Sequence, residues 1–254
     1  MNPVDRDAVY AVPALDKALD VLELLADQKD GLSQGQISEA VGRSLSQIYR
    51  VLVALERRGY LYRDRASGLY FLSVRMFELA HRHEPLRGLV QIALPPMRWL
   101  ADELQQSCNL GVLQAGRVLV LAQVESPASF GFRVRVGAEF PIDTATGHVL
   151  LAFRPESDAE ASAAWTSASG SLAALRERLD RLREQGYDEI ADSLQPGITD
   201  VAFPVVGRSG SAVAALTVPY VATNYSRRDL AAVRKAAATA TRQMRDALCG
   251  EVGA

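Results

Sequence analysis

The chain has 254 residues, of which 48% are hydrophobic and 23% are charged, and its formal net charge is −2. This composition is typical of a soluble globular protein of two domains that needs no disulfide or metal to hold its core. No uncharged apolar run reaches the roughly 18 residues of a membrane span, and the first residues lack the order of a signal peptide. We therefore expect a cytoplasmic protein with no membrane partner, whose Cys108 and Cys249 are ordinary thiols.

Charge is distributed unevenly along the first third of the chain. Residues 1–42 contain three basic and eight acidic residues, a net charge of −5, whereas residues 43–75 contain seven basic and two acidic residues, a net charge of +5. All seven basic residues are arginine, whose planar fork fits phosphates and guanine edges better than lysine does. A basic segment within an acidic protein indicates a local nucleic-acid footprint.

The first predicted elements form a helix-turn-helix. Apolar residues at helical spacing predict a helix over residues 14–27. Ser33 with Gln36 has the pattern of a capping box before a short helix that ends at Gly42. Ser44 with Gln47 repeats that pattern before a second helix, which ends at Gly59. Two short capped helices around a tight turn are typical of the DNA-binding motif.

After this motif, the residue pattern changes from one typical of helices to one typical of strands. Residues 60–63 and 69–72 are β-prone runs joined by the turn-rich loop 64–68, which predicts a hairpin. A hairpin directly after a helix-turn-helix is a wing.

The remaining residues alternate between strand and helix patterns. We expect a helix over 74–83 and a long helix over 86–106, with an interruption at Pro85 and an irregularity at Pro95 and Pro96. Further helices are expected at 147–153, 172–185 and 226–248, and strands at 108–114, 117–124, 130–136, 187–191, 200–206 and 211–219. Antiparallel strand pairs with separate helices predict an α+β fold with a sensor-like second domain.

The helix from Ser44 to Arg58 is the candidate recognition helix. In helix-turn-helix proteins its N-terminal end meets base edges, where Gln pairs with adenine and Arg with guanine. Arginines beside the helix and in the wing, Arg63 among them, suit the phosphate backbone. The candidate DNA-binding residues are Arg43, Ser44, Ser46, Gln47, Tyr49, Arg50, Arg57 and Arg65. A solvated helix pair with surface arginines is the alternative interpretation.

The order of these motifs resembles that of IclR-type bacterial transcriptional regulators over residues 14–245. The resemblance rests on residues 14–25, 31–33, 55–61 and 68–72, and then on 124–127, 146–153, 185–187, 196–197, 202–205 and 214–218. It implies a winged helix-turn-helix domain (1–73), a linker helix (74–85) and a GAF-like α/β effector-binding domain (86–254). It also implies a homodimer, often paired into a tetramer, that binds double-stranded operator DNA and a small organic effector such as a carboxylate or aromatic acid.

The resemblance also implies an effector site, and two residues of this chain differ there from the family's usual pattern. The family's small-residue turn corresponds to residues 143–147, one residue shorter than the commoner pattern. Ile190 stands where the family often has Asp, and Asp200 where it often has Cys. The candidate effector-binding residues are Thr144, Ala145, Thr146, Gly147, Ile190, Asp200 and Thr217.

Asp200 leaves several interpretations open. An acid there repels a carboxylate ligand unless it is protonated or paired, and it can instead accept from a hydroxyl or an amine. The ligand differs from the usual acids, the site is degenerate, or Asp200 only caps a turn. Phe130 and Phe132 either line the pocket or pack in a core or interface.

No catalytic, metal or cofactor site is expected. The sequence has no GxGxxG, P-loop, GxSxG or HExxH motif, and His81 and His83 are spaced wrongly to share a metal on a helix. His148 is interpreted as a weak anion contact or an exposed residue, and Asp188, Glu189 and Asp192 as a solvated edge.

The function that we expect is that of a DNA-binding transcriptional regulator, repressor or activator, controlled by a small organic ligand such as a catabolic-pathway metabolite. The alternatives are a ligand-independent DNA-binding protein and an enzyme with a regulatory winged-helix domain.

Overall fold

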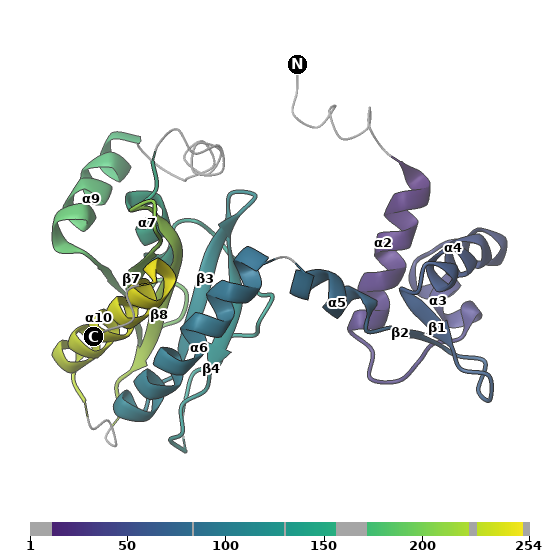
Figure 1. Ribbon diagram of the computed structural model, residues 1–254, viewed down its shortest axis with the longest axis horizontal. Helices are drawn as coiled ribbons and strands as arrows, with labels where there is room; N and C mark the ends of the chain where they lie inside the picture. Colours follow the sequence, from purple (N-terminus) through teal and green to yellow (C-terminus); the bar gives the residue numbers. More distant parts are fainter. Residues whose placement is uncertain (1–11, 83, 130, 156–171, 224–227, 251–254) are drawn as a thin grey trace. The chain divides into compact units, whose positions relative to one another are not determined.

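A computed structural model describes residues 12–82, 84–129, 131–155, 172–223 and 228–250 (Figure 1). The chain divides into two compact units, the N-terminal unit of residues 1–87 and the C-terminal unit of residues 88–254.

The N-terminal unit is a three-helix cluster with a two-stranded antiparallel hairpin and a further helix. A shared core holds Ile37 and Ile48 from the helix pair and Leu61 and Tyr70 from the hairpin, all almost fully buried. The prediction of a helix-turn-helix followed by a wing is confirmed. The elements are α2 (Pro13–Ala26), α3 (Gln34–Ala40), α4 (Leu45–Arg57), β1 (Leu61–Arg63), β2 (Tyr70–Leu72) and α5 (Arg75–Arg82).

The two predicted helix caps differ in the structure. Ser33 forms the capping box with Gln36, since the Gln36 amide donates to the Ser33 hydroxyl at 3.3 Å and the Ser33 amide donates to Gln36 Oε1 at 2.9 Å. Ser44 occupies the N-cap position of α4, but its side chain makes no capping bond. Its hydroxyl lies 3.3 Å from the Ser46 hydroxyl instead. The second capping box was therefore a wrong prediction, because a local hydroxyl pair replaces it.

The C-terminal unit is built on a six-stranded antiparallel sheet in the order β5-β4-β3-β8-β7-β6. Helices α6 and α10 cover one face, and α7 and α9 cover the other (Figure 1). The α+β class is confirmed. The elements are α6 (Glu84–Leu104), β3 (Cys108–Gln114), β4 (Arg117–Val124), β5 (Glu139–Phe140), α7 (Ala145–Ala152), α9 (Leu172–Gln185), β6 (Asp188–Ala191), β7 (Ile198–Val206), β8 (Ala212–Val221) and α10 (Leu230–Cys249).

Strand alternation divides the sheet between two cores. Leu110 and Leu216 face α6 and α10, whereas Ala202 and Ala215 face α7 and α9. Because both faces are covered, β7 and β8 are apolar along most of their length.

One predicted strand is absent from the described residues. Residues 131–135 carry no strand, and a short strand at Glu139–Phe140 pairs with β4 instead. The alternation that predicted the strand is real, because Phe132 and Val134 face a cavity while Arg133 and Arg135 are exposed. Alternating burial arises here without a hydrogen-bonded ladder.

Prolines interrupt the long helix less than expected. Helix α6 begins at Glu84, so Pro85 lies in its first turn, where no backbone N–H is needed for the helix. Pro95 and Pro96 lie within α6, which continues to Leu104.

Gly147 packs α7 closely against the chain that precedes it. The Thr144 hydroxyl caps α7 by accepting from the Gly147 amide at 3.2 Å. A Cβ added to Gly147 would lie 2.1 Å from the Ile142 carbonyl oxygen. Backbone must therefore move to admit any side chain at this position.

We predict that Gly147→Ala destabilises the protein by about 1–3 kcal/mol or more through overpacking. The matched control is Gly88→Ala in α6, where an added Cβ meets nothing within 4 Å and helix propensity favours Ala. Denaturant unfolding of both variants measures the difference. Equal stability of the two variants would contradict this packing.

Candidate functional site

Helix α4 presents one stripe of side chains away from the core of the N-terminal unit. Ile48, Leu52 and Leu55 are buried on its inner face. The side chains opposite, here called the outer stripe, follow at i, i+4, i+7 and i+11 and are all exposed: Ser46, Arg50, Val53 and Arg57. Three of these four were predicted to contact DNA, and the structure brings them onto one face of one helix.

The other predicted residues of this region lie around the N-terminal end of α4. Arg43 and Ser44 precede the helix and are exposed, and Tyr49 is exposed beside the outer stripe. Because no side chain caps α4, its first-turn amides suit an anion such as a phosphate. Gln47 is half-buried and lines a groove with residues of α2, and the exposed Arg50 borders the same groove.

Of the two arginines in the wing, the side chain of Arg63 is held by contacts within the wing and that of Arg65 is not. The Asp64 carboxylate accepts from the Ser67 amide at 2.7 Å and from its hydroxyl at 2.6 Å, and these hydrogen bonds lower the pKa of the Asp64 carboxyl. Arg63 donates to the Gly68 carbonyl at 3.0 Å and lies over the Tyr70 ring. Arg65 is exposed in the turn between the strands.

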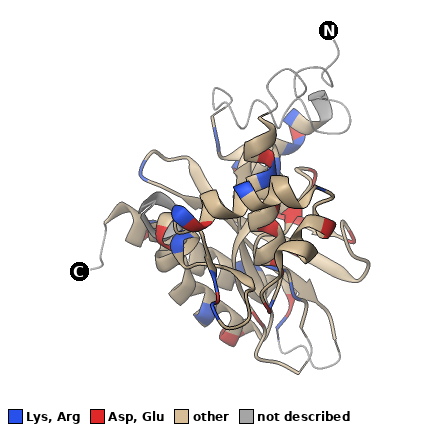
Figure 2. Cartoon of the chain, turned by 90° about the vertical axis from the view of Figure 1, so that its right-hand side faces the viewer, with Lys and Arg blue, Asp and Glu red and all other residues tan. Residues whose placement is uncertain are grey.

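Acidic and basic residues lie on different elements of the N-terminal unit. Helix α2 and the residue that follows it carry four acids, at 16, 20, 23 and 27, whereas α4, its C-cap Arg58 and the wing carry five of the seven arginines of residues 43–75. Figure 2 shows basic residues in blue and acidic residues in red. The basic charge that the sequence places in residues 43–75 thus lies on the candidate recognition helix and the wing.

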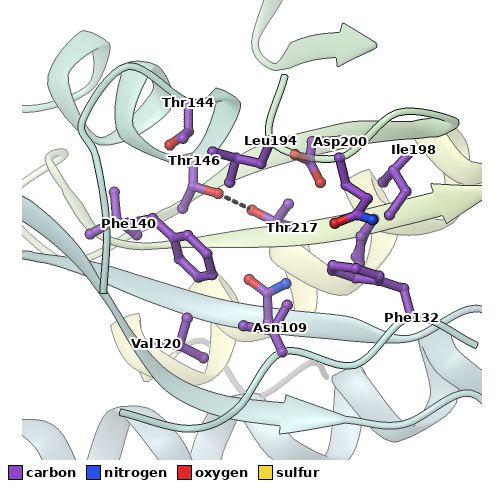
Figure 3. Close-up of a pocket in the computed structure, with 14 residues that line it drawn as sticks. Asn109, Val120, Phe132, Phe140, Thr144, Thr146, Leu194, Ile198, Asp200 and Thr217 are labelled. Atoms are coloured by element: carbon purple, nitrogen blue, oxygen red, sulfur yellow. Dashed lines mark hydrogen bonds between the residues drawn. The ribbon is translucent and has the colours of Figure 1, made fainter. Parts of the chain in front are cut away.

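A cavity of about 280 Å³ lies in the C-terminal unit between the sheet and the start of α7 (Figure 3). Its volume is near the lower end of small-molecule sites, about 300–1,000 Å³. The lining is mostly apolar, with a few polar side chains. The lining residues are Asn109, Val118, Val120, Phe132, Val134, Phe140, Thr144, Thr146, Leu194, Gln195, Ile198, Asp200, Thr217 and Pro219.

Four predicted effector residues line this cavity, namely Thr144, Thr146, Asp200 and Thr217. Three others do not line it. Ala145 is fully buried in the core under α7, Gly147 faces the Ile142 carbonyl, and Ile190 packs against the same core. Phe132 lines the cavity, and Phe130 lies outside the described residues.

The polar groups of the cavity include two without a partner. The Thr146 and Thr217 hydroxyls lie 2.7 Å apart. The side chains of Asn109 and Asp200 make no hydrogen bond or ion pair with the residues that the structure describes. Asn109 is 7% exposed, and Asp200 is half-buried. Sequence reasoning missed Asn109, whose only signal is a polar residue within an otherwise apolar strand.

His148 belongs to a buried charged cluster, which corrects its interpretation as an anion contact or exposed residue. It is 4% exposed, and its Nδ1 lies 3.0 Å from Asp188 while its Nε2 lies 3.0 Å from Asp143. Asp188 is also buried and accepts from Arg178 at 2.9 Å, so it is not a solvated edge.

This cluster connects α7 to α9 and β6. Because Asp143 directly precedes Thr144, the His148 contact fixes the turn that leads into the cavity lining. No local pattern indicated this cluster, since Asp188 lies 40 residues beyond His148.

The described residues hold no group of three His, Cys, Asp or Glu that could bind a metal ion. The cysteines are unpaired, and burial raises the pKa of the Cys108 thiol to about 12. Within the described part of the chain, no helix is long and apolar enough to cross a membrane.

Comparison with known proteins gives consistent matches over most of the chain. The family model "IclR helix-turn-helix domain" matches residues 14–65, and "Bacterial transcriptional regulator IclR C-terminal" matches residues 86–245. The transcriptional regulator KdgR of Escherichia coli is 27% identical over 224 residues, which cover 85% of each chain. The regulator XynR of Escherichia coli is 26% identical over 235 residues, covering 88% of this chain and 92% of XynR.

Solved structures share the same architecture. An IclR transcriptional regulator from Alicyclobacillus acidocaldarius has a TM-score of 0.71 and 25% identity, covering 94% of this chain and 99% of that one. An IclR homologue from Microbacterium hydrocarbonoxydans, complexed with 4-hydroxybenzoate, has a TM-score of 0.75 and 22% identity, covering 93% and 99%.

Asp200 makes the stability of the C-terminal unit depend on pH. Burial raises the pKa of the Asp200 carboxyl from 3.8 to about 6, so folding favours its protonated form. That contribution is present below the unfolded pKa and is lost as the pH rises through the folded pKa. We predict that Asp200→Asn is more stable than wild type near neutral pH by roughly 1–3 kcal/mol, and that the difference closes toward about pH 4.

Urea unfolding across this pH range measures the effect. Trp99 lies in α6 of the C-terminal unit, so its fluorescence reports the unfolding of that unit. Glu184→Gln, the same change at an exposed position of α9, is the control and should show no such trend. A stability difference that does not vary with pH would show that burial does not perturb Asp200.

Proposed function

Because this chain belongs to the IclR family of bacterial transcriptional regulators, we propose that it binds operator DNA through α4 and the wing. We further propose that a small organic ligand, a catabolic-pathway metabolite, controls this binding from the cavity of the C-terminal unit. The outer stripe of α4 carries the proposal, since it presents Ser46, Arg50 and Arg57 together on one exposed helix face.

In this proposal the residues divide into two roles. Arg50 and Ser46 on the outer stripe read base edges in the major groove, where an arginine pairs with guanine through two hydrogen bonds. Arg43, Ser44 and the first-turn amides of α4 hold a phosphate, and Arg65 in the wing neutralises the backbone. Arg57 and Tyr49 flank these contacts. Gln47 is the weakest candidate, because it is half-buried in the groove beside α2, whereas Arg50 borders that groove and is exposed.

We propose that the protein acts as a cytoplasmic homodimer, with pairing into a tetramer as the family resemblance implies. The exposed apolar side chains Leu15 and Leu19 of α2 and Met76 of α5 support a protein partner in the N-terminal unit. Two copies of α4 then enter successive major grooves about 34–36 Å apart, which requires a near-palindromic operator.

Ligand control requires that the ligand favours one of two arrangements of the dimer. We propose that residues 74–85, the linker helix between domains 1–73 and 86–254, transmit the difference to the two recognition helices. Repression and activation both fit this scheme, because the sign depends on where the operator lies relative to the promoter. The proposal includes no catalytic role, as the named relatives are regulators.

We predict that Arg50→Ala weakens binding to a specific operator by about 1–3 kcal/mol and leaves binding to random DNA nearly unchanged. A mobility-shift titration on DNA upstream of the protein's own gene, at a stated salt concentration, measures both. Arg245→Ala, an exposed arginine of α10, is the matched control.

Arg65→Ala provides the contrast within the same surface. A phosphate contact predicts an equal loss on all sequences and a flatter dependence on salt. An equal loss from Arg50→Ala on operator and random DNA would remove Arg50 from base reading, and no loss from either variant would refute this surface as the DNA interface.

A further inference from the structure

We infer that the cavity of the C-terminal unit binds a small alcohol or amine that donates a hydrogen bond to Asp200, and that it discriminates against carboxylates. This inference rests on the proposed function and names the chemical class of the effector. It comes from the charge, the unpartnered groups and the walls of the cavity.

The charge of the lining is one-sided. Among the described residues that line the cavity, Asp200 is the single charged side chain, and no Lys, Arg or His accompanies it. The nearby His148 does not compensate, because Asp143 and Asp188 occupy both of its nitrogens. Arg178 is likewise bound to Asp188. A carboxylate in the cavity would therefore share a partly buried space with an unneutralised acid.

Besides the exposed Gln195, two side chains in the cavity have hydrogen-bonding capacity that the described residues leave unused. The Asp200 carboxylate accepts, whereas the Asn109 amide both donates and accepts, and neither has a partner. Asn109 lies opposite Thr217 in the β3–β8 register, so its amide and the hydroxyl pair of Thr146 and Thr217 belong to one polar end of the cavity (Figure 3). No polar atom of either side chain is sealed in the core without a partner, so both groups remain open to the cavity, where a bound donor can satisfy them.

A helix N-terminus attracts anions through its free backbone amides, but not all of the amides at the start of α7 are free. The Thr144 hydroxyl already accepts from the Gly147 amide, which takes one of the donors at this helix N-terminus. The Thr146 hydroxyl is engaged with Thr217. The remaining amides do not remove the opposition between a bound carboxylate and Asp200.

The walls set the size and shape of the ligand. Val118, Val120, Phe132, Phe140 and Ile198 provide an apolar surface, and the volume is about 280 Å³. A single aromatic ring or a short aliphatic chain with one donor group fits such a cavity. Benzyl alcohol, benzylamine and benzoate share one ring and differ only in the polar group, so they serve as matched probes.

The test measures the dissociation constants of these three probes by calorimetry on the full chain near pH 8, where Asp200 is ionised. We expect benzylamine and benzyl alcohol to bind in the millimolar range or tighter, and benzylamine to bind at least about tenfold more tightly than benzoate, a difference of about 1.4 kcal/mol. Benzyl alcohol separates hydrogen bonding from charge, because it donates without a positive charge.

Two variants test whether Asp200 causes the preference for benzylamine over benzoate. Asp200→Asn should reduce the ratio of benzylamine to benzoate affinity by about tenfold or more. Glu184→Gln, which also replaces one acid of the C-terminal unit by its amide but lies on exposed α9, should leave the ratio unchanged. Benzoate binding as tight as benzylamine, no measurable binding of either donor, or a ratio unaffected by Asp200→Asn would each overturn the inference.

Operator binding, measured on the same samples, keeps this inference separate from the proposed function. A protein that binds its operator but prefers benzoate retains the function and refutes the ligand class. A protein that binds no operator sequence refutes the function whatever the probes do.

Discussion

The seating of α7 against the sheet is the constraint on which the C-terminal unit depends. Gly147 allows the helix to approach the Ile142 carbonyl at a distance that no Cβ tolerates. His148, one residue later, joins Asp143 in the preceding turn to Asp188 in β6. The cavity lies where the turn, the helix start and the sheet meet, so its shape follows from these contacts rather than from the residues that face a ligand.

The two units differ in how their charged residues are arranged. The N-terminal unit gathers acidic residues on α2 and arginines on α4 and the wing, which makes a local basic surface in a chain whose net charge is −2. Among the described residues of the C-terminal unit, the buried Asp188 instead contacts His148 and Arg178, whereas Asp200 at the cavity has no such partner. An exposed cation attracts a polyanion at little cost, whereas a half-buried acid without a partner is costly unless a ligand binds it.

Local signals predicted most of the fold, and distant contacts account for what they missed. Helical periodicity, the Ser33 capping box and the hairpin turn lie within a few residues of each other, so the sequence contains them directly. Ser44 has the same cap pattern, yet its hydroxyl meets Ser46, a choice between local partners that spacing does not decide. His148 and Asn109 depend on residues 40 or more positions away, and only the folded sheet brings those together.

The most direct measurement selects DNA from a random-sequence pool with the full-length protein, at fixed salt and with excess competitor. The account predicts enrichment of one near-palindromic motif whose half-sites are separated by about one helical turn or a multiple of it, and loss of that enrichment in Arg50→Ala. Recovery of no motif above the starting pool, or of the same motif by the variant, would contradict the claim that the outer stripe of α4 reads an operator.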